Sequence, residues 1–551
     1  MPLRSRSTYI SIGLGLVAIV FGAFFYHSTI EDAFISFRYA EHLAQGYGLG
    51  AWNPGETPVE GYTTMLWVLI LGLGAKMGIS VLTLSKALGW LSMIAIFLVI
   101  YNFKHFARDF LPQWNWGRIG VISAVLVSLY FPMAWYSVSG MEVCPYALLL
   151  LLFIGLSLKY GHLSNYSDLI AAILLLLTRP EGIIIVGIVY LGLLLSARGH
   201  APGFRIVLLK LSTIALFLIA ITIWRWLYFG YPLPNTYYAK AAGTWGHVAL
   251  GWVYLRDAFT KWGYWLPLLS VVFVGWRYFR HRNLPAIVIS WIAAVFVYLL
   301  FILKTGGDNW YAFPYYRHLL HLFPFMAVIF AMVLVSLCKE RIWPVIIAVV
   351  LALFFLNRKV VFDPDPIGAE LREEGLISKM MDPSRLLRHD PPSEYIAWVR
   401  NTFPPTTRLA ATLAGALPYY TDFNTLDMLG LSTPHIAHYG TFAPGAVDTK
   451  SDMDYVMSQR PDLIETTIDA NLILNNRPRS RNEAWRGMME NRMIDNPIFK
   501  KEYLFIRNVP YTAFPRALFI KESFLRDLPN KSELEVTPVM ETSLYLITSQ
   551  E

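Results

Sequence analysis

The chain has 551 residues, of which 55% are hydrophobic and only 15% are charged, and its formal net charge is +8. Soluble domains usually carry about 25% charged residues, so this composition excludes an ordinary soluble enzyme and indicates a polytopic membrane protein. Much of the Lys and Arg falls in short loops between apolar runs, where it orients helices, so nucleic-acid binding is not expected. The two cysteines, Cys144 and Cys338, encode neither a disulfide framework nor a zinc site.

The apolar run at residues 9–26 follows Arg4 and Arg6 and lacks a small-residue cleavage site, which predicts a retained first helix. Further runs predict a total of about eleven spans; these runs are centred near residues 91, 127, 150, 173, 189, 217, 271, 294, 328 and 349. The run at 63–76 is expected to lie flat at the membrane surface. With that run on the surface, the basic loops lie on the same side of the membrane as Arg4 and Arg6. Because loops rich in Lys and Arg remain in the cytoplasm, this side is predicted to be cytoplasmic.

This topology places the unusual polar motifs outside the cytoplasm. Beyond Leu356 the chain is polar, and no later run is long and apolar enough to span a membrane. We therefore predict a transmembrane domain over residues 1–357 and an extracytoplasmic domain over residues 358–551. In the latter, "RLAATLAGALPYYTDFNTLDMLGLS" predicts strand, short helix and strand, which favours a mixed α/β fold.

Two adjacent carboxylates, Glu31 and Asp32, stand where the first apolar run ends. Repulsion between neighbouring acids and partial burial both raise a carboxyl pKa, so either residue is a candidate general base. The alternative is an acidic cap at the start of the helix "DAFISFRYAEHLA", where negative charge is favoured. This helix is amphipathic and suits a membrane surface, and Arg38 among its polar residues is a candidate substrate-binding residue.

The glycine-rich loop that follows brings Asn53, Glu60 and Tyr62 to the water side, which makes them candidate substrate-binding residues. Its glycines are not spaced as a dinucleotide fingerprint before a helix. Some aromatic residues of the outer loops could stack on sugar rings, although most suit interface belts.

Three further outer motifs carry ionisable groups beside apolar runs. Arg179 and Glu181 in "LLLLTRPEG" are either functional or paired with each other. The other candidates are Asn235 and Lys240 in "PLPNTYYAK", and Asp308 and Arg317 in "GGDNWYAFPYYR". Arginine and lysine at this rim could bind a phosphate, or could anchor lipid headgroups.

Six segments, taken in order, resemble the bacterial GT-C glycosyltransferases similar to the mycobacterial terminal β-(1→2)-arabinofuranosyltransferase. They are "EDAFISFRYAEHLAQGYGLGAWNPGETPVEGYT", "SGMEV", "LTRPEG", "YFGYPLPNTYYAK", "GGDNWYAFPYYRHLLHLFP" and "LDMLGLSTPHIAH". The resemblance spans residues 28 to about 440. It implies a bundle of membrane helices whose first outer loop carries the catalytic acid, and a polyprenyl-phosphate sugar as donor.

The family's usual Asp-Asp pair corresponds to Glu31 and Asp32, so this chain differs from the family at the first position and matches it at the second. Asp32 is therefore the expected catalytic residue, with Glu31 beside it. The resemblance also places other residues around the site; these are Glu60, Arg179, Glu181, Asn235, Lys240, Asp308 and Arg317. Arg317, Lys240 and Arg179 are expected to bind the donor phosphate, and the others the substrate.

The expected reaction moves a sugar, arabinofuranose or similar, to a cell-envelope glycan or glycolipid at the outer face of a bacterial inner membrane, where the site and C-terminal domain are periplasmic. The expected partners are the donor, the acceptor and membrane lipids. A divalent cation held by Glu31, Asp32 or Asp308 could assist, although three scattered acids define no metal site. The alternatives are a flippase for a lipid-linked sugar and a protein O-glycosyltransferase with the same bundle.

Overall fold

In the computed structural model, most of the chain is described. The described segments are residues 29–107, 114–240, 245–265, 268–273, 286–307, 316–338, 342–362, 394–442, 450–466, 495–510 and 517–541, with a few isolated residues between them. The predicted first helix at 9–26 and the candidate residue Asp308 lie outside these segments.

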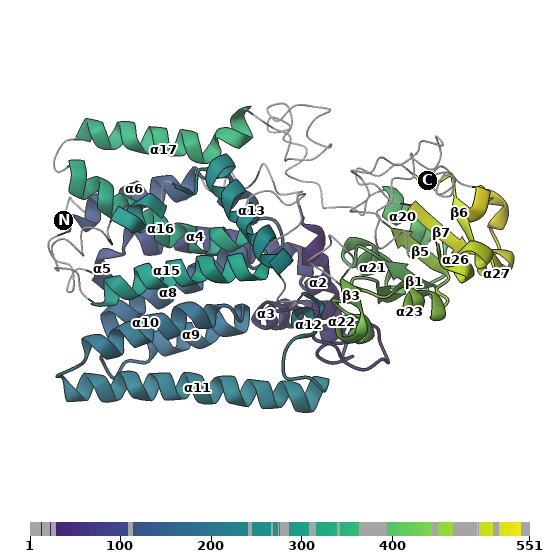
Figure 1. Cartoon of the computed structure of the whole chain (residues 1–551), viewed down its shortest axis with the longest axis horizontal. Helices are drawn as coiled ribbons and strands as arrows, with labels where there is room; N and C mark the ends of the chain where they lie inside the picture. Colours follow the sequence, from purple (N-terminus) through teal and green to yellow (C-terminus); the bar gives the residue numbers. More distant parts are fainter. Residues whose placement is uncertain are drawn as a thin grey trace.

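A bundle of apolar helices forms one half of the molecule (Figure 1). Its helices are α4 (Val81–Tyr101), α6 (Trp116–Ser128), α8 (Val143–Tyr160), α9 (Ser167–Thr178), α10 (Gly182–Ser196), α11 (Ala201–Phe229), α13 (Trp245–Trp262), α15 (Ala286–Thr305), α16 (Arg317–Cys338) and α17 (Ile342–Phe362). Among the described residues, α4, α8, α11 and α16 are long and apolar enough to cross a membrane, and several shorter apolar helices accompany them. The mainly helical membrane bundle that the hydropathy predicts is thus confirmed.

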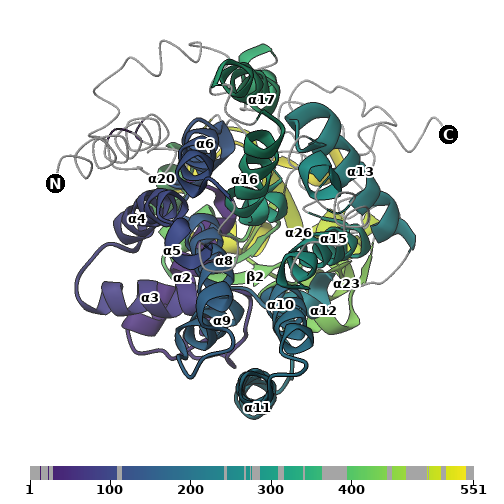
Figure 2. The same ribbon diagram turned by 90° about the vertical axis from the view of Figure 1, so that its left-hand side faces the viewer.

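A layer of short elements covers one end of this bundle. It contains α2 (Glu31–Ala44), α3 (Met65–Lys76) and α12 (Asn235–Lys240). Two other short helices, α5 (Lys104–Ala107) and α7 (Phe131–Tyr136), connect bundle helices. Figure 2 looks along α11 and shows α3 from the side, so α3 runs across the direction of α11.

The C-terminal part is a six-stranded sheet with strand order β2-β1-β5-β7-β6-β8. The strands are β1 (Arg408–Ala411), β2 (Asn424–Asp427), β5 (Leu463–Thr466), β6 (Tyr503–Ile506), β7 (Ala517–Lys521) and β8 (Val536–Pro538). β1 is parallel to β2 and β5, whereas β7 is antiparallel to β5 and β6, and β8 is antiparallel to β6. The mixed sheet confirms the predicted α/β fold.

Short helices surround this sheet. They are α20 (Glu394–Thr402), α21 (Ala416–Thr421), α22 (Pro434–Tyr439), α23 (Met453–Ser458), α26 (Pro497–Glu502), α27 (Glu522–Asp527) and the 3₁₀ turns η4 (Lys531–Glu533) and η5 (Val539–Glu541). A small hairpin of β3 (Thr441–Phe442) and β4 (Lys450–Ser451) completes the described elements. The predicted strand, helix and strand at 408–432 correspond to β1, α21 and β2.

The C-terminal part docks onto α2 through the buried guanidinium of Arg38. Its Nε donates to the Trp52 carbonyl at 3.0 Å and its Nη2 to the Phe423 carbonyl at 2.9 Å, and its Nη1 donates to the Pro418 carbonyl. Burial lowers the pKa of Arg38 to about 10, which still leaves it charged at neutral pH. One arginine therefore joins α2, the first outer loop and α21 over about 380 residues of sequence separation.

Two asparagine side chains also join the C-terminal part to the rest of the chain. Asn53 pairs with the backbone of Thr425, since its Oδ1 accepts from the amide at 2.9 Å and its Nδ2 donates to the carbonyl at 3.1 Å. Asn235 donates to the carbonyls of Gly430 and Leu431 at 2.9 and 2.8 Å. Buried backbone groups need such partners, so these amides fix the C-terminal part on this end of the bundle.

Candidate active site between the bundle and the C-terminal part

The first turn of α2 and the first residue of α16 meet at the end of the bundle that faces the C-terminal part. Asp32 Oδ2 and Arg317 Nη1 are 3.2 Å apart, and the same Nη1 lies 3.5 Å from the Met141 sulfur. The Asp32 side chain is 30% exposed and that of Arg317 is 11% exposed, so the acid can be reached from outside while the guanidinium is mostly enclosed. The fold thus brings together an acid and a base that are 285 residues apart in sequence.

The neighbouring acid points elsewhere. Glu31 Oε1 accepts the backbone N–H of Ala416 at 3.0 Å, so this side chain caps the start of α21 in the C-terminal part. Gly415 packs against the same residue so closely that a Cβ atom there would lie 2.1 Å from the Glu31 carbonyl oxygen. The two adjacent acids therefore have different contacts: Glu31 bonds to the C-terminal part, and Asp32 faces Arg317.

A buried charge cluster lies between α8, α9 and α10. Arg179 Nη1 donates to Glu142 Oε1 at 2.5 Å, and its Nε donates to Glu181. All three side chains are buried. Two carboxylates therefore neutralise Arg179, so mutual pairing, the alternative considered from the sequence, is what the structure shows. Glu142 was missed as a partner because the motif "SGMEV" gives no spacing signal toward residue 179.

Two histidines at the start of α16 extend this cluster. His318 Nδ1 lies 3.9 Å from Glu181 Oε1, and the candidate ligand atoms of Glu181, His318 and His321 lie within 4.8 Å of one another. His321 Nδ1 lies 3.3 Å from the hydroxyl of Tyr298. Within the described part of the chain, His318 Nδ1 and His321 Nε2 are buried without a hydrogen-bond partner. Two imidazoles and a carboxylate are a ligand set that suits a divalent transition metal.

Sequence reasoning missed these histidines, although the spacing i, i+3 in "RHLLH" places both on one helix face. The ligands expected for a divalent cation were Glu31, Asp32 or Asp308 instead. Of these, Glu31 and Asp32 are engaged with Ala416 and Arg317.

Three further candidates are Glu60, Tyr62 and Lys240. Glu60 forms a two-point ion pair with Arg225 of α11, with distances of 2.8 and 2.9 Å. Burial raises the pKa of Glu60, although Arg225 acts against this shift. The buried Tyr62 ring packs against Tyr39 with ring centroids 4.8 Å apart. Lys240, the last residue of α12, is exposed and its side chain is accessible to a ligand.

Comparison with known proteins identifies the fold. A family model described as "Domain of unknown function (DUF8728)" matches residues 385–516. No curated protein matches the chain. One similar solved structure is the archaeal oligosaccharyltransferase AglB from Archaeoglobus fulgidus in complex with an inhibitory peptide and a dolichol-phosphate. It is 9% identical, the match covers 97% of this chain and 76% of AglB, and the TM-score is 0.52.

A second similar structure is ArnT from Cupriavidus metallidurans bound to undecaprenyl phosphate. It is 13% identical, the match covers 93% of this chain and 97% of ArnT, and the TM-score is 0.50. The apo form of the Archaeoglobus oligosaccharyltransferase gives a TM-score of 0.52 at 11% identity, over 98% of this chain and 78% of that one. These matches over nearly the whole chain show that the protein has the GT-C fold.

Proposed function

We propose that the protein is a membrane glycosyltransferase that moves a sugar from a polyprenyl-phosphate donor to a glycan or glycolipid. The observation that carries this proposal is the Asp32–Arg317 pair, which joins the starts of α2 and α16 in a GT-C bundle. A carboxylate next to a mostly enclosed guanidinium supplies a proton acceptor and a phosphate-binding group side by side. The lipid-bound AglB and ArnT structures support a donor of this class.

In the proposed reaction, the oxygen of an acceptor hydroxyl attacks the anomeric carbon of the sugar, and Asp32 accepts the proton of that hydroxyl. The bond between that carbon and the phosphate oxygen breaks, and the polyprenyl phosphate leaves with the electron pair. Arg317 and the exposed Lys240 stabilise the charge on the leaving phosphate. Arg179 would contribute only at longer range, because Glu142 and Glu181 already neutralise it.

The sugar that we propose is arabinofuranose or a similar furanose, on the resemblance of the ordered outer motifs. The proposed location is a bacterial inner membrane with the site on the periplasmic side, which the distribution of basic loops supports. A reporter that is active only outside the cytoplasm, inserted after the exposed Asp527, tests this orientation. Activity of a cytoplasm-only reporter at the same position would reverse it.

Transfer of labelled sugar from a polyprenyl-phosphate donor by the purified protein tests the proposed activity. Asp32→Asn is nearly isosteric and removes the proton acceptor, so we expect the rate to fall about a hundred- to ten-thousandfold. Glu31→Gln is expected to cost less, since an amide oxygen can still accept from Ala416. Thermal unfolding in detergent controls for folding. Near-normal transfer by a folded Asp32→Asn variant would remove Asp32 from the mechanism, and passage of intact lipid-linked sugar across vesicles without transfer would favour a flippase.

A further inference from the structure

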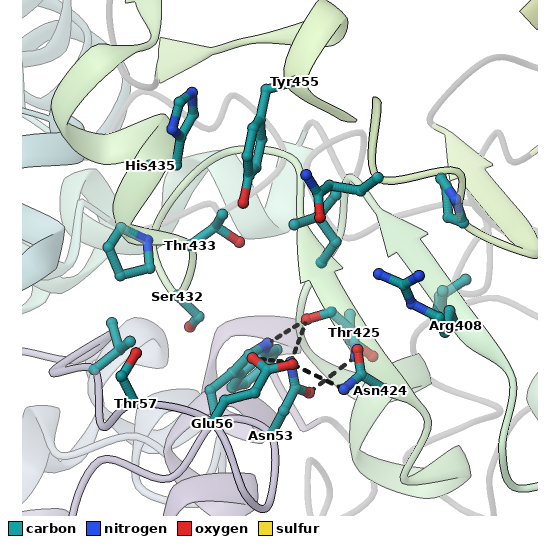
Figure 3. Close-up of a pocket in the computed structure, with 17 residues that line it drawn as sticks. Asn53, Glu56, Thr57, Arg408, Asn424, Thr425, Ser432, Thr433, His435 and Tyr455 are labelled. Atoms are coloured by element: carbon teal, nitrogen blue, oxygen red, sulfur yellow. Dashed lines mark hydrogen bonds between the residues drawn. The ribbon is translucent and has the colours of Figure 1, made fainter. Parts of the chain in front are cut away.

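A cavity of about 360 Å³ lies between the first outer loop and the C-terminal part, away from the Asp32–Arg317 pair (Figure 3). The loop contributes residues from Trp52 to Val59, and the outer part contributes the starts of β1 and β2, the start of α22 and the end of α23. The transfer reaction proposed above makes no use of this cavity.

The cavity combines an aromatic surface with neutral polar groups and two side chains of opposite charge. The rings of His435 and Tyr455 are stacked, with centroids 3.8 Å apart and planes 13° apart, and both line one wall. Figure 3 shows Thr433 and Arg408 on other sides of the space and Glu56 facing them. Aromatic faces pack on the apolar face of a sugar ring, and hydroxyl, amide and charged groups bind its hydroxyls.

The charge of the lining favours a neutral ligand over a phosphate. Among the described residues that line it, Arg408 is the one arginine or lysine and Glu56 is the one carboxylate. One cation balanced by one anion gives no excess positive charge to hold a phosphate, which arginine and lysine clusters bind.

Hydrogen bonds across the junction fix the floor of the cavity. Glu56 accepts from the Asn424 amide at 2.9 Å and from the Asn53 amide at 3.0 Å. The indole N–H of Trp52 donates to the Thr425 carbonyl at 2.8 Å. These bonds join the loop to β2, so a ligand meets groups that are already in place, which lowers the entropic cost of binding.

Helix α2 connects this cavity with the proposed catalytic acid. Asp32, Ser36 and Tyr39 follow the spacing i, i+4, i+7 and so share one helix face. The Tyr39 hydroxyl donates to Ser432 Oγ at 3.1 Å, and Ser432 lines the cavity. Seven residues of helix correspond to about 10 Å. A molecule that occupies both places must therefore be longer than a single sugar.

We propose that this cavity binds a neutral saccharide unit of the acceptor, remote from the hydroxyl that reacts at Asp32. This inference rests on the proposed function and deepens it, because it makes the acceptor a glycan of several sugars rather than a monosaccharide lipid. The stacked Tyr455 is its aromatic platform, and Arg408 is a hydrogen-bond donor to sugar hydroxyls.

Binding and transfer are measured separately to test this. Saturation-transfer NMR with the full-length protein in detergent uses neutral hexasaccharides and disaccharides of arabinofuranose, mannose and glucose as probes, together with a neutral decapeptide. We expect a hexasaccharide to bind. Tyr455→Ala should weaken that binding about tenfold through the loss of an aromatic contact, and Arg408→Gln should weaken it by a similar factor through the loss of a charged hydrogen-bond donor. Tyr455→Phe keeps the ring and should bind nearly as wild type. Arg526→Gln, an exposed arginine on α27, is the matched control.

In the transfer assay, Tyr455→Ala and Arg408→Gln should raise KM for long acceptors and leave KM for the donor unchanged. Failure of every hexasaccharide to bind, or binding of the peptide alone, would overturn the inference. In an active protein, equal hexasaccharide binding and equal transfer by Tyr455→Ala and Tyr455→Phe would also overturn it. If the wild type binds the hexasaccharide but transfers no sugar, and Tyr455→Ala loses that binding, the proposed transferase activity is refuted and the saccharide-binding site is supported.

Discussion

At the scale of single residues, two carboxylates with similar sequence signals have different surroundings. Adjacent acids could have shared one function, but Glu31 caps α21 and Asp32 meets Arg317. The pair was visible in the sequence because two acids beside an apolar run are unusual. Their division of contacts was not, because it depends on Ala416 and Arg317, which only the tertiary fold brings near.

The role of Arg317 can be separated from that of Asp32 by kinetics. Arg317→Ala removes the guanidinium that we expect to bind the donor phosphate, so KM for the lipid donor should rise and kcat should fall. Arg225→Ala, which breaks the ion pair with Glu60 instead, is a control for loss of a buried charge near the outer face. An effect of Arg317→Ala that depends only on acceptor concentration would reassign this residue to the acceptor.

Asp427 gives a prediction about pH. It is fully buried, and burial raises its pKa to about 6, although its oxygens accept the backbone N–H groups of Ser432 and Leu429 at 2.7 and 2.9 Å. The folded state therefore holds a proton that the unfolded state releases near pH 4, so stability falls as pH rises from about 4 to about 6 and is level above that.

The expected loss over this window is about 3 kcal/mol, from the difference between the two pKa values. It is measured as the pH dependence of the unfolding temperature in detergent. Asp427→Asn should remove that slope, because an amide does not titrate in this pH range. Asp527→Asn, at an exposed position, should keep the slope. An unchanged slope in Asp427→Asn would assign the pH dependence to other groups.

At the scale of elements, periodicity and composition predicted the type of most helices and the α/β nature of the C-terminal part. The apolar runs are long and the strand, helix and strand at 408–432 have clear turn residues, so local sequence suffices there. The order of the six strands was not predictable, because β5, β7 and β6 are neighbours through contacts that local sequence does not encode. Arg38, Asn53 and Asn235 were expected to bind substrate, and the structure shows their side chains bonded across the domain junction.

Helix α16 carries the prediction about a cation. We propose that Glu181, His318 and His321 hold one divalent transition metal, which would fix the start of α16 next to Arg317. Elemental analysis of protein purified without chelator should find about one metal per chain, and His321→Leu should lose it. His105→Leu, at an exposed histidine, is the control. Equal metal content in both variants and the wild type would refute the site.

At the scale of the whole molecule, the C-terminal part and the bundle meet through close backbone packing as well as side chains. A Cβ at Gly415 would lie 2.1 Å from the Glu31 carbonyl oxygen, so any larger residue must separate α21 from α2. We expect Gly415→Val to loosen this docking by about 1–3 kcal/mol, as overpacking does, and to reduce transfer because Asp32 shifts with Glu31.

Limited proteolysis within α2, followed over time, measures that loosening. Gly187→Ala is the control, because a Cβ at Gly187 meets nothing within 4 Å. Wild-type protection of α2 in a folded Gly415→Val protein would show that the docking does not depend on this contact.

The position of α2 also bears on the order of folding. Its 14 residues are too few for a stable isolated helix, and its buried face is covered by α3 from the same end of the chain and by α21 from the other. A chain is synthesised from its N-terminus, so Asp32 emerges early, yet the segment that fixes its helix emerges about 380 residues later. The proposed catalytic centre therefore assembles only after the outer domain has been made and has docked, and a chain whose synthesis stops within the bundle lacks an ordered acid.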